Sequence, residues 1–404
     1  MEVLYERCCG LDVHKKTVTA CVITSNGKEL REFGTMTGDL LEMGDWLAGA
    51  GCTHVAMEST GVYWKPVYNL LEGLNMTVLV VNARHIKAVP GRKTDVKDAE
   101  WIADLLRHGL LRGSFVPDRD QRELRDIVRY RASVVKERVR EVNRIQKVLE
   151  AANVKLGSVA SDVMGKSGTN MIRAIVEGTE DVEVLSEMAK GRLRSKKEDL
   201  KKALQGLVSN HQRMLLREIL RHIQYLDAAI ERLSAEIQER MCSYEHALEA
   251  LDEIPGVGRR IAEQVLAETG TDMNQFPSAD HLSSWAGMCP GNNESAGKRK
   301  SGRTSQGNMN LKSTLVEASH GAAHTKDTYL SALYRRFLPR MGKKRALVAV
   351  GHCILVIIYC MLRYGTRYVD MGADYFDKRN EEHIVRKLTK RLNEFGYEVT
   401  PKAA

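Results

Sequence analysis

The order of strand and helix signals in the first 111 residues constrains the fold of this chain more than any other feature. The expected elements are strands at 8–13, 17–23 and 32–35, a helix at 40–50, a strand at 54–58, a helix at 62–74, a strand at 76–82 and a helix at 95–111. Asn26 and Gly27 mark a turn between the second and third strands. Three successive strands followed by alternating helices and strands predict an α/β domain with a mixed sheet covered on both faces.

A long helix is expected at 122–149, with its positive charge arranged in a stripe. Cationic side chains recur every three or four residues, at Arg122, Arg125, Arg129, Lys136, Arg140, Arg144 and Lys147. Apolar side chains recur on the opposite face, at Leu124, Val128, Val135, Val139, Val142 and Leu149. The basic face suits a nucleic-acid backbone. It equally suits a solvated charged face, because acidic residues share the helix.

A second long helix is expected at 200–244, and it carries an apolar seam. The seam residues alternate by three and four positions: Leu216, Ile219, Ile223, Leu226, Ile230, Leu233 and Ile237. This spacing is typical of a coiled coil. The partner of the seam is either the first long helix or a second protomer.

The patterns divide the chain into four expected parts. These are an N-terminal α/β domain at 1–118, a long helical region at 119–246, a mostly helical domain at 247–370 and a charged appendage at 371–404. The fold class is therefore α/β plus α.

The charge and the cysteine content of the chain indicate its type of partner and the state of its thiols. The chain has 61 Lys+Arg against 52 Asp+Glu, a formal net charge of +9, which favours a polyanionic partner without proving one. Its eight cysteines are scattered and include no C-x-x-C pair, so we expect reduced thiols and no zinc site.

Two segments bear on export and membranes. Glu2 and Glu6 precede any apolar run, so we expect no signal peptide and a cytoplasmic protein. The stretch from Ala346 to Leu362 is almost wholly apolar, yet it is short for a membrane span and contains Gly351 and His352. We therefore expect a buried core helix and no membrane partner.

Four carboxylates fall at positions where strand ends and a helix start can converge. Asp12 interrupts the first apolar strand, Glu58 ends a later strand, and Asp95 and Asp98 lie three apart at the start of a helix. Hard Mg²⁺ or Mn²⁺ ions prefer such oxygen ligands, and paired ions assist phosphoryl transfer. Taken singly, the helix acids also suit the helix dipole, and Glu58 also suits a strand-end surface position.

The sequence motifs around these acids point to a narrower group of proteins. The strand-strand-strand-helix arrangement resembles the RNase-H-like (RuvC-like) nucleases and resolvases. The segments GLDVHK at 10–15, MESTG at 57–61 and KTDVKDA at 93–99 resemble the three signatures of the DEDD transposases of the IS110 insertion-sequence family, which are RNA-guided recombinases. The resemblance implies that Asp12, Glu58, Asp95 and Asp98 bind the metal ions, with His14 as an orienting neighbour.

The segment IPGVG at 254–258 lies between two helical stretches and looks like a helix-hairpin-helix turn. Gly256 and Gly258 let the backbone approach a phosphate, the following helix offers free N–H groups, and Arg259 adds charge. An ordinary helix-helix turn with a capping glycine fits the same residues.

A basic loop rich in glycine and serine spans 291–308, and Lys298, Arg299, Lys300 and Arg303 are its candidate DNA contacts. Ser295, Ser301 and Ser305 are all eligible nucleophiles on their chemistry. The same transposases have a serine-containing motif and a later glycine-asparagine motif in this region, and the resemblance implies that Ser295 is the nucleophile. The chain departs from the family pattern at Ala296 and at Ser305-Gln306.

Together these features predict RNA-guided, site-specific DNA strand exchange by a transposase. The resemblance implies a composite site of carboxylates and Ser295, donor and target DNA, a structured bridge RNA, and a homodimer that assembles to a tetramer. The rival readings are a metal-dependent Holliday-junction resolvase or nuclease, which needs no serine, and a noncatalytic nucleic-acid-binding scaffold, in which the acids are structural.

Overall fold

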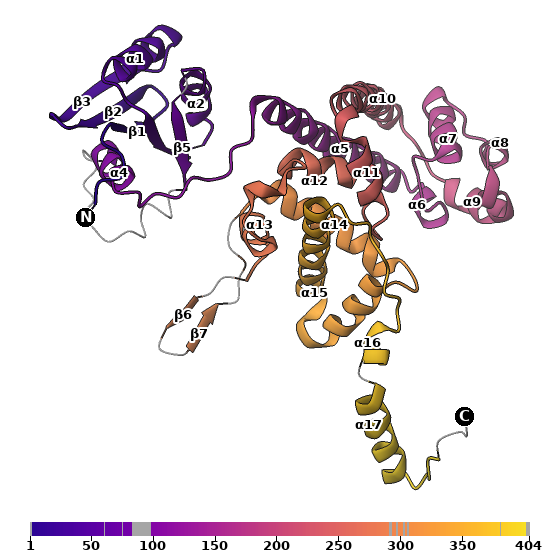
Figure 1. Cartoon of the computed structure of the whole chain (residues 1–404). Coiled ribbons are helices and arrows are strands. Elements are labelled where there is room, and N and C mark those ends of the chain that lie inside the picture. The colour runs from indigo at the N-terminus through magenta and orange to yellow at the C-terminus, as the bar shows by residue number, and fades with distance from the viewer. Residues whose placement is uncertain are drawn as a thin grey trace. The chain divides into compact units, whose positions relative to one another are not determined.

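A computed structural model of the chain describes residues 2–400 except 60, 75, 83–97, 291–292, 296–297, 302–303, 305–306 and 380. For 293–295, 298–301 and 382–384 it describes the backbone alone. The chain divides into two compact units, Met1–Pro117 and Asp118–Ala404, whose elements are labelled in Figure 1.

The first unit is built on a five-stranded sheet in the order β3-β2-β1-β4-β5. Its strands are β1 (Cys8–Val13), β2 (Thr17–Thr24), β3 (Gly27–Gly34), β4 (His54–Glu58) and β5 (Thr77–Val81). β2 pairs antiparallel with β1 and β3, whereas β4 lies parallel to both β1 and β5. The mixed sheet expected from the order of elements is therefore confirmed.

Helices cover both faces of this sheet (Figure 1). They are α1 (Thr37–Gly49), α2 (Trp64–Glu72) and α4 (Asp98–Arg107). α1 and α2 pack on the face that carries Leu11 and Met57, while α4 packs on the face that carries Cys8 and Ala56. Because side chains alternate along a strand, residues 8, 10 and 12 of β1 all share the face under α4.

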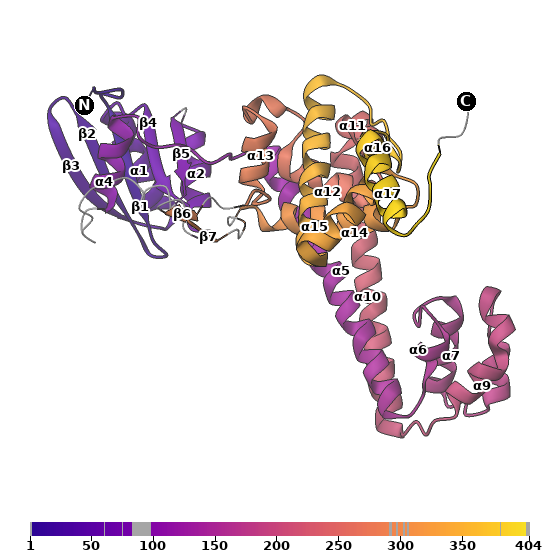
Figure 2. The ribbon, with the colours of Figure 1, turned by 90° about the horizontal axis from the view of Figure 1, so that it is seen from below.

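Two long antiparallel helices, α5 (Arg119–Ala151) and α10 (Asn210–Arg240), lie side by side in the second unit (Figure 2). Val134 of α5 packs against Leu226 and Ile230 of α10, and Arg138 forms an ion pair with Asp227. The apolar seam of α10 thus finds its partner within the same chain.

The second long helix is shorter than the sequence predicted. The stretch expected as one helix at 200–244 forms the end of α9 (Lys197–Leu204), a short non-helical link and α10. In the link, a Cβ on Gly206 would lie 2.5 Å from the carbonyl oxygen of Ala152, and Ser209 then forms a capping box with Gln212. This close approach and cap interrupt the helix although its apolar periodicity continues.

A separate apolar core closes the far end of this helix pair. Its helices are α6 (Leu156–Val159), α7 (Lys166–Glu177), α8 (Val182–Glu187) and α9. Ile145 of α5 and Leu216 of α10 join Met171 and Leu200 in this core, and Figure 2 shows α6, α7 and α9 beside the helix ends. The hairpin of long helices is therefore packed at this end as well as in its middle.

The rest of the second unit is a helical bundle. Its main helices are α11 (Glu245–Asp252), α12 (Arg259–Thr269), α13 (Ala279–Trp285), α14 (Met309–His324) and α15 (Tyr329–Tyr364). α15 is broken at Gly342, whose φ of 75° and ψ of 165° are not helical, three residues after Pro339. In its second arm, a Cβ on Gly351 would lie 2.8 Å from Ser319 Oγ, so α14 and α15 pack closely there.

The apolar stretch of α15 is long and apolar enough to cross a membrane by length and composition. Half of its most apolar window is buried inside the protein, where Val350, Ile354 and Ile358 are fully enclosed. This burial agrees with the core helix that the sequence predicted.

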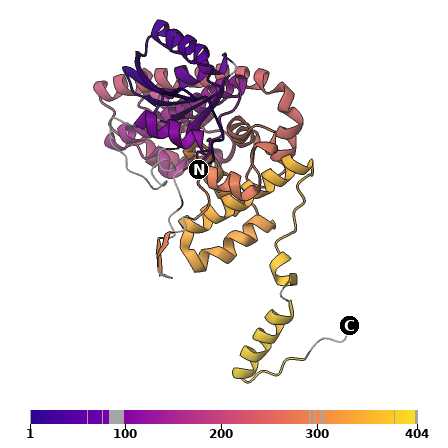
Figure 3. The same ribbon diagram turned by 60° about the vertical axis from the view of Figure 1, so that its left-hand side comes forward.

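The chain continues through α16 (Tyr375–Arg379) to α17 (Glu381–Glu394), the last helix before the C-terminus in Figure 3. Phe376 of α16 stacks on Tyr329 at the start of α15, with 5.3 Å between ring centroids. Helix α17 exposes Val385 and Leu388, and Phe395, which follows the helix, is exposed as well.

Candidate functional site

The parallel pairing of β1 and β4 brings Asp12 and Glu58 to the same edge of the sheet. Leu11 pairs with Met57 in the last rung of this ladder, and the two acids follow at the next position on each strand. Neighbouring residues in register point to the same face of a sheet. Since Leu11 and Met57 face α1 and α2, the carboxylates of Asp12 and Glu58 lie on the opposite face, under α4.

Helix α4 brings Asp98 to that face. A Cβ on Gly10 would lie 2.3 Å from the Ala99 carbonyl oxygen and 2.4 Å from the Ala103 nitrogen, so only glycine allows α4 to cross β1 this closely. Asp98, half-buried, is the first residue of α4 and precedes Ala99. Three of the four predicted acids therefore share one face at one edge of the sheet.

The fourth predicted acid, Asp95, lies outside the described residues, which resume at Asp98. Within the described ranges no group of three His, Cys, Asp or Glu side chains is close enough to hold a metal ion. The donors on this face are carboxylate oxygens, the type that Mg²⁺ and Mn²⁺ prefer. The donor chemistry thus fits a divalent cation, while the assembly of the full ligand set lies beyond the described part of the chain.

His14 also lies at this edge, beside Asp12. Its Nε2 lies 3.1 Å from Oδ2 of Asp12, and its backbone N–H donates to the Thr17 carbonyl oxygen at 2.9 Å. The histidine side chain is exposed, whereas that of Asp12 is 21% exposed. The structure thus places His14 beside a predicted ligand, where it can orient the carboxylate.

The serine loop contains a short hairpin rather than an irregular coil. β6 (Asn293–Ser295) pairs antiparallel with β7 (Lys298–Ser301), and Ser295 stands opposite Lys298. Arg299 and Lys300 follow in β7, whereas Arg303 and Ser305 lie outside the described residues. Ser295 and Ser301 are thus both within the two strands.

The base of this hairpin is fixed by contacts on both of its sides. Thr304 forms an isolated bridge with Pro290 and accepts a hydrogen bond from Lys312 Nζ at 2.5 Å. A Cβ on Gly307 would lie 2.3 Å from the Gly287 nitrogen, so the two ends of the loop touch. The hairpin therefore leaves the bundle from a defined base.

Asn308, which ends this loop, connects the hairpin base to a buried acid. Its side chain caps α14 by accepting from the backbone N–H of Asn310 and Leu311, each at 3.1 Å. Its amide nitrogen donates to Glu268 Oε2 at 2.6 Å. Glu268, on α12, is 4% exposed.

Two arginines of the predicted basic stripe meet the same acid. Arg129 donates to Glu268 through Nε at 2.7 Å and Nη2 at 2.8 Å. Arg125 Nε lies 3.3 Å from that carboxylate, its Nη2 donates to the Glu268 carbonyl oxygen at 2.6 Å, and burial lowers the pKa of Arg125 to about 10. The guanidinium groups of Arg125 and Arg129 thus bind protein acceptors in this structure.

Other cations of the basic stripe are more exposed to solvent than Arg125. Arg122 is half-buried, Lys136 is exposed, and Arg140 is exposed with an ion pair to Glu137 at 3.6 Å. Val139, expected on the packed apolar face, is 51% exposed, whereas Arg131 and Glu141 are buried there. The role of Glu268 is not predicted from the sequence, although an acid among the apolar residues of α12 was a visible signal.

The turn between α11 and α12 packs against α14. Gly256 has a φ of 85°, and a Cβ there would lie 2.2 Å from the Ala318 carbonyl oxygen and 2.5 Å from the Ala322 nitrogen. Gly258 is the N-cap of α12, and Arg259 forms ion pairs with Glu245 and Glu263. Gly256 therefore serves the packing of this turn on α14, and the charge of Arg259 is paired with acids of the protein.

Two family models of known proteins match segments of the chain that contain these candidate residues. Residues 9–154 match the DEDD transposase model of IS110 elements, and residues 248–335 match the model described as the transposase IS116/IS110/IS902 family. The first match contains all four predicted acids, and the second contains the turn, the serine hairpin and Asn308.

Curated bacterial relatives extend the similarity over most of the chain. A probable family 20 transposase of Pseudomonas aeruginosa is 26% identical over 66% of this chain and 70% of its own length. The transposase for insertion sequence element IS1111A of Coxiella burnetii is 24% identical over 87% of this chain and 88% of its own. A pilin gene-inverting protein of Moraxella bovis is 24% identical over 92% of this chain and 98% of its own.

Proposed function

Because the chain belongs to the IS110 family of DEDD transposases, we propose that it catalyses RNA-guided, site-specific exchange of DNA strands when its insertion sequence transposes. The observation that supports this most is the placement of Asp12, Glu58 and Asp98 on one face at one edge of the sheet. Relatives that include a gene-inverting protein are consistent with site-specific exchange.

We assign Asp12, Glu58, Asp95 and Asp98 as the ligands of Mg²⁺ or Mn²⁺. Bound divalent cations would supply positive charge against the oxygens of a scissile phosphate. The carboxylates hold these cations at the sheet edge, and His14 restrains the carboxylate of Asp12 through its 3.1 Å contact.

Ser295 is the proposed nucleophile. Its hydroxyl loses a proton, Oγ forms a bond to phosphorus, and the bond from phosphorus to one DNA oxygen breaks and leaves a DNA hydroxyl. Attack by a hydroxyl of the exchanged strand then releases Ser295, so each phosphodiester broken is replaced by another. Carboxylates and Ser295 form one composite site in this proposal, with the two groups supplied by different protomers.

Bridge RNA and DNA backbones are the proposed partners of the basic surface. Lys136 and Arg140 on α5, and Lys298, Arg299, Lys300 and Arg303 around the hairpin, are the cations for this role. Arg122, Gly256 and Gly258 are secondary candidates. Arg125, Arg129 and Arg259 would have to exchange protein acceptors for phosphate.

Assembly and location complete the proposal. A homodimer that pairs to a tetramer would supply both halves of the composite site. The seam of α10 packs on α5, so the dimer needs another surface. A cytoplasmic location beside the nucleoid follows from a chromosomal DNA substrate.

The test is strand exchange by the purified full chain with Mg²⁺, the RNA transcribed from its flanking DNA, and donor and target duplexes. Asp12→Asn and Glu58→Gln should each abolish product while leaving the protein folded. Asp45→Asn, a matched change of an exposed acid on α1, should leave the rate unchanged. Exchange that survives Asp12→Asn would reject the carboxylate site, whereas a wild type that binds DNA or RNA without exchanging strands would favour a scaffold role.

A further inference from the structure

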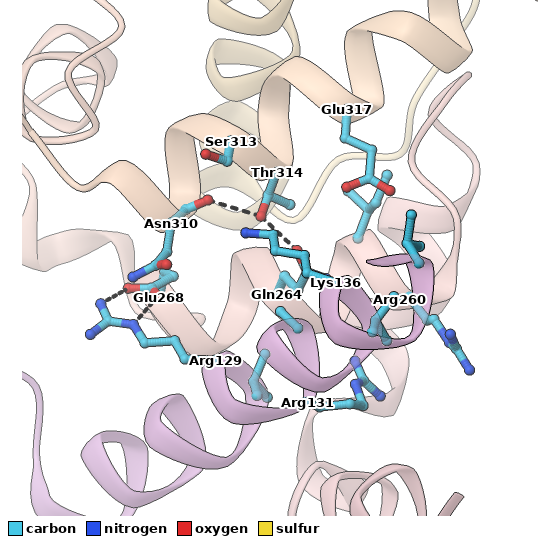
Figure 4. Close-up of a pocket in the computed structure, with 15 residues that line it drawn as sticks. Arg129, Arg131, Lys136, Arg260, Gln264, Glu268, Asn310, Ser313, Thr314 and Glu317 are labelled. Carbon is cyan, nitrogen blue, oxygen red and sulfur yellow. Dashed lines mark hydrogen bonds and ion pairs between the residues drawn. The ribbon is translucent and has the colours of Figure 1, made fainter. Parts of the chain in front are cut away.

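A pocket of about 390 Å³ lies between α5, α12 and α14 in the second unit (Figure 4). Its volume falls within the range of sites that take small ligands. It adjoins the base of the serine hairpin, because Asn310, which lines it, follows two residues after Asn308. A ligand held here would therefore lie near the base of the serine hairpin.

One wall of the pocket is apolar. Val128, Ala132 and Val135 line it from α5, and Ile261 lines it from α12. These side chains offer a surface to a flat, uncharged group, because apolar contact area is buried without demanding a hydrogen bond. The pocket is therefore built for more than a free anion.

Directional polar groups line the side formed by α12 and α14. The Thr314 hydroxyl donates a hydrogen bond to Gln264 Oε1 at 2.6 Å. Because the amide oxygen of Gln264 is the acceptor in this bond, its amide N–H groups face a ligand as donors. Figure 4 shows the carboxylate of Glu317 directed into the pocket, where it can accept a hydrogen bond from an amino group. A heterocycle with both donors and acceptors on its edge matches this side.

Four cations line the pocket, and two of them are already paired. Arg131 donates to Glu263 at 2.7 Å, and Arg129 to Glu268. These two arginines are structural, because their guanidinium charge is compensated by buried carboxylates.

Lys136 and Arg260 are different. Both side chains are exposed, and neither makes an ion pair or a side-chain hydrogen bond with the residues that the structure describes. In Figure 4 Lys136 reaches across the pocket from α5, while Arg260 stands at its edge. Two uncompensated cations on opposite helices favour an anionic ligand whose charge lies at the rim.

We propose that this pocket holds one unstacked nucleotide of a nucleic acid bound to the transposase. The base lies on the apolar wall with its edge toward Gln264 and Glu317, and the flanking phosphates meet Lys136 and Arg260. The pocket is enclosed by three helices, so it admits a single extruded nucleotide rather than a duplex. This inference rests on the proposed function, because it requires a nucleic-acid substrate or guide.

Fluorescence of 2-aminopurine tests this directly, because the probe brightens when its base leaves the stack. The probe is placed in turn at unpaired or junction positions of the RNA and of each DNA strand, and the full chain is added. At least one position should brighten several-fold with the wild type. Whether that position is in RNA or DNA identifies the source of the nucleotide.

Two changes test the pocket in different ways, one by filling it and one by removing a charge. Ala132→Phe fills the pocket without changing charge, so the base should return to the stack. Lys136→Gln should weaken binding and lower the salt dependence by about one counterion. Arg232→Gln, an exposed arginine on α10, is the matched control and should weaken binding no more than one nonspecific surface charge does.

The outcomes separate this inference from the proposed function. A probe that brightens equally with wild type and folded Ala132→Phe, or at no position, would overturn the pocket assignment, even if strand exchange is intact. A wild type that brightens the probe yet exchanges no strands would leave the pocket standing and reject the proposed reaction. Displacement of the probe by an acidic peptide alone, with no nucleotide dependence, would also reject the nucleotide.

Discussion

Glu268 joins three elements of the second unit through one buried carboxylate. It belongs to α12, pairs with Arg125 and Arg129 of α5, and accepts from Asn308 at the start of α14. A buried acid with these partners is stable only while they remain, because an unpaired buried charge is costly. The base of the serine hairpin therefore depends on a residue outside it.

Glu268→Gln should lower the free energy of unfolding of the second unit by about 3 kcal/mol, because it leaves two guanidinium groups without their acid. Glu218→Gln is the control, since its ion pair with Arg221 at 2.8 Å is exposed on both sides. That change should cost about 0.5 kcal/mol or less. Equal losses in chemical denaturation of the two variants would contradict the assigned role of Glu268.

The buried thiols of the first unit make its stability sensitive to alkali. Burial raises the pKa of Cys52 to about 12, and it raises the pKa values of Cys8 and Cys21 to about 11. In the unfolded chain these thiols ionise near pH 8.5. Their contribution to stability is thus fully present below about pH 8.5 and is lost as the pH rises through 11 to 12.

Thermal unfolding of the first unit between pH 7 and pH 10.5 measures this dependence. The midpoint should be nearly constant to about pH 8.5 and fall above it. Cys52→Ala should flatten the fall, because one of the raised groups is gone. A midpoint that does not fall between pH 8.5 and pH 10.5 would show that the thiols are not desolvated as described.

At the scale of elements, the turn between α11 and α12 offers a matched pair of glycines. Gly256→Ala should destabilise the bundle by about 2 kcal/mol or more, because its φ is 85° and the new Cβ would meet the α14 backbone. Gly258 has a φ of −79°, and the nearest atom to a Cβ there is 4.0 Å away. Gly258→Ala should change stability by less than about 0.5 kcal/mol.

Chemical denaturation of both variants tests the packing role of this turn, and DNA affinity of Gly258→Ala tests its phosphate-binding role. If Gly258→Ala lowers DNA affinity while leaving the fold intact, the turn has the phosphate role proposed for it. Similar stability of the two variants would mean that the contact of Gly256 with α14 is not needed.

The arrangement of the first unit could be predicted from the sequence because it depends on local patterns. A mixed sheet is specified by the successive strands, the Asn26-Gly27 turn and the alternation of helices. Asp12 was recognisable as a candidate because burying an unpaired charge within an apolar strand is energetically costly. Asp12 and Glu58 share a face because strand register fixes side-chain direction, whereas Asp98 comes to that face on α4.

The helical elements could be predicted less well because long-range partners decide them. Arg125 and Arg129 fitted a solvent-facing stripe, yet they turn toward Glu268, about 140 positions away in sequence. No local pattern reveals such a pair. The start of α10 at Asn210 likewise depends on the contact of Gly206 with Ala152.

At the scale of the molecule, the chain divides after Pro117 into two units with separate cores. The first unit buries apolar side chains on both faces of its sheet, which is sufficient for independent folding. A fragment of residues 1–117 should therefore unfold cooperatively on heating, with dispersed amide resonances in its NMR spectrum. A fragment that is disordered until residues 118–404 are added would contradict this division.

In the proposed reaction, carboxylates of the first unit and Ser295 of the second unit act on the same phosphodiester. The most direct measurement is a search for a covalent protein–DNA adduct, trapped by denaturation during strand exchange with Mg²⁺, RNA and labelled duplexes. We expect an adduct with wild type and with Ser301→Ala, and no adduct with Ser295→Ala or Asp12→Asn. Cleavage that persists in Ser295→Ala without any adduct would contradict it and leave a metal-dependent nuclease or resolvase.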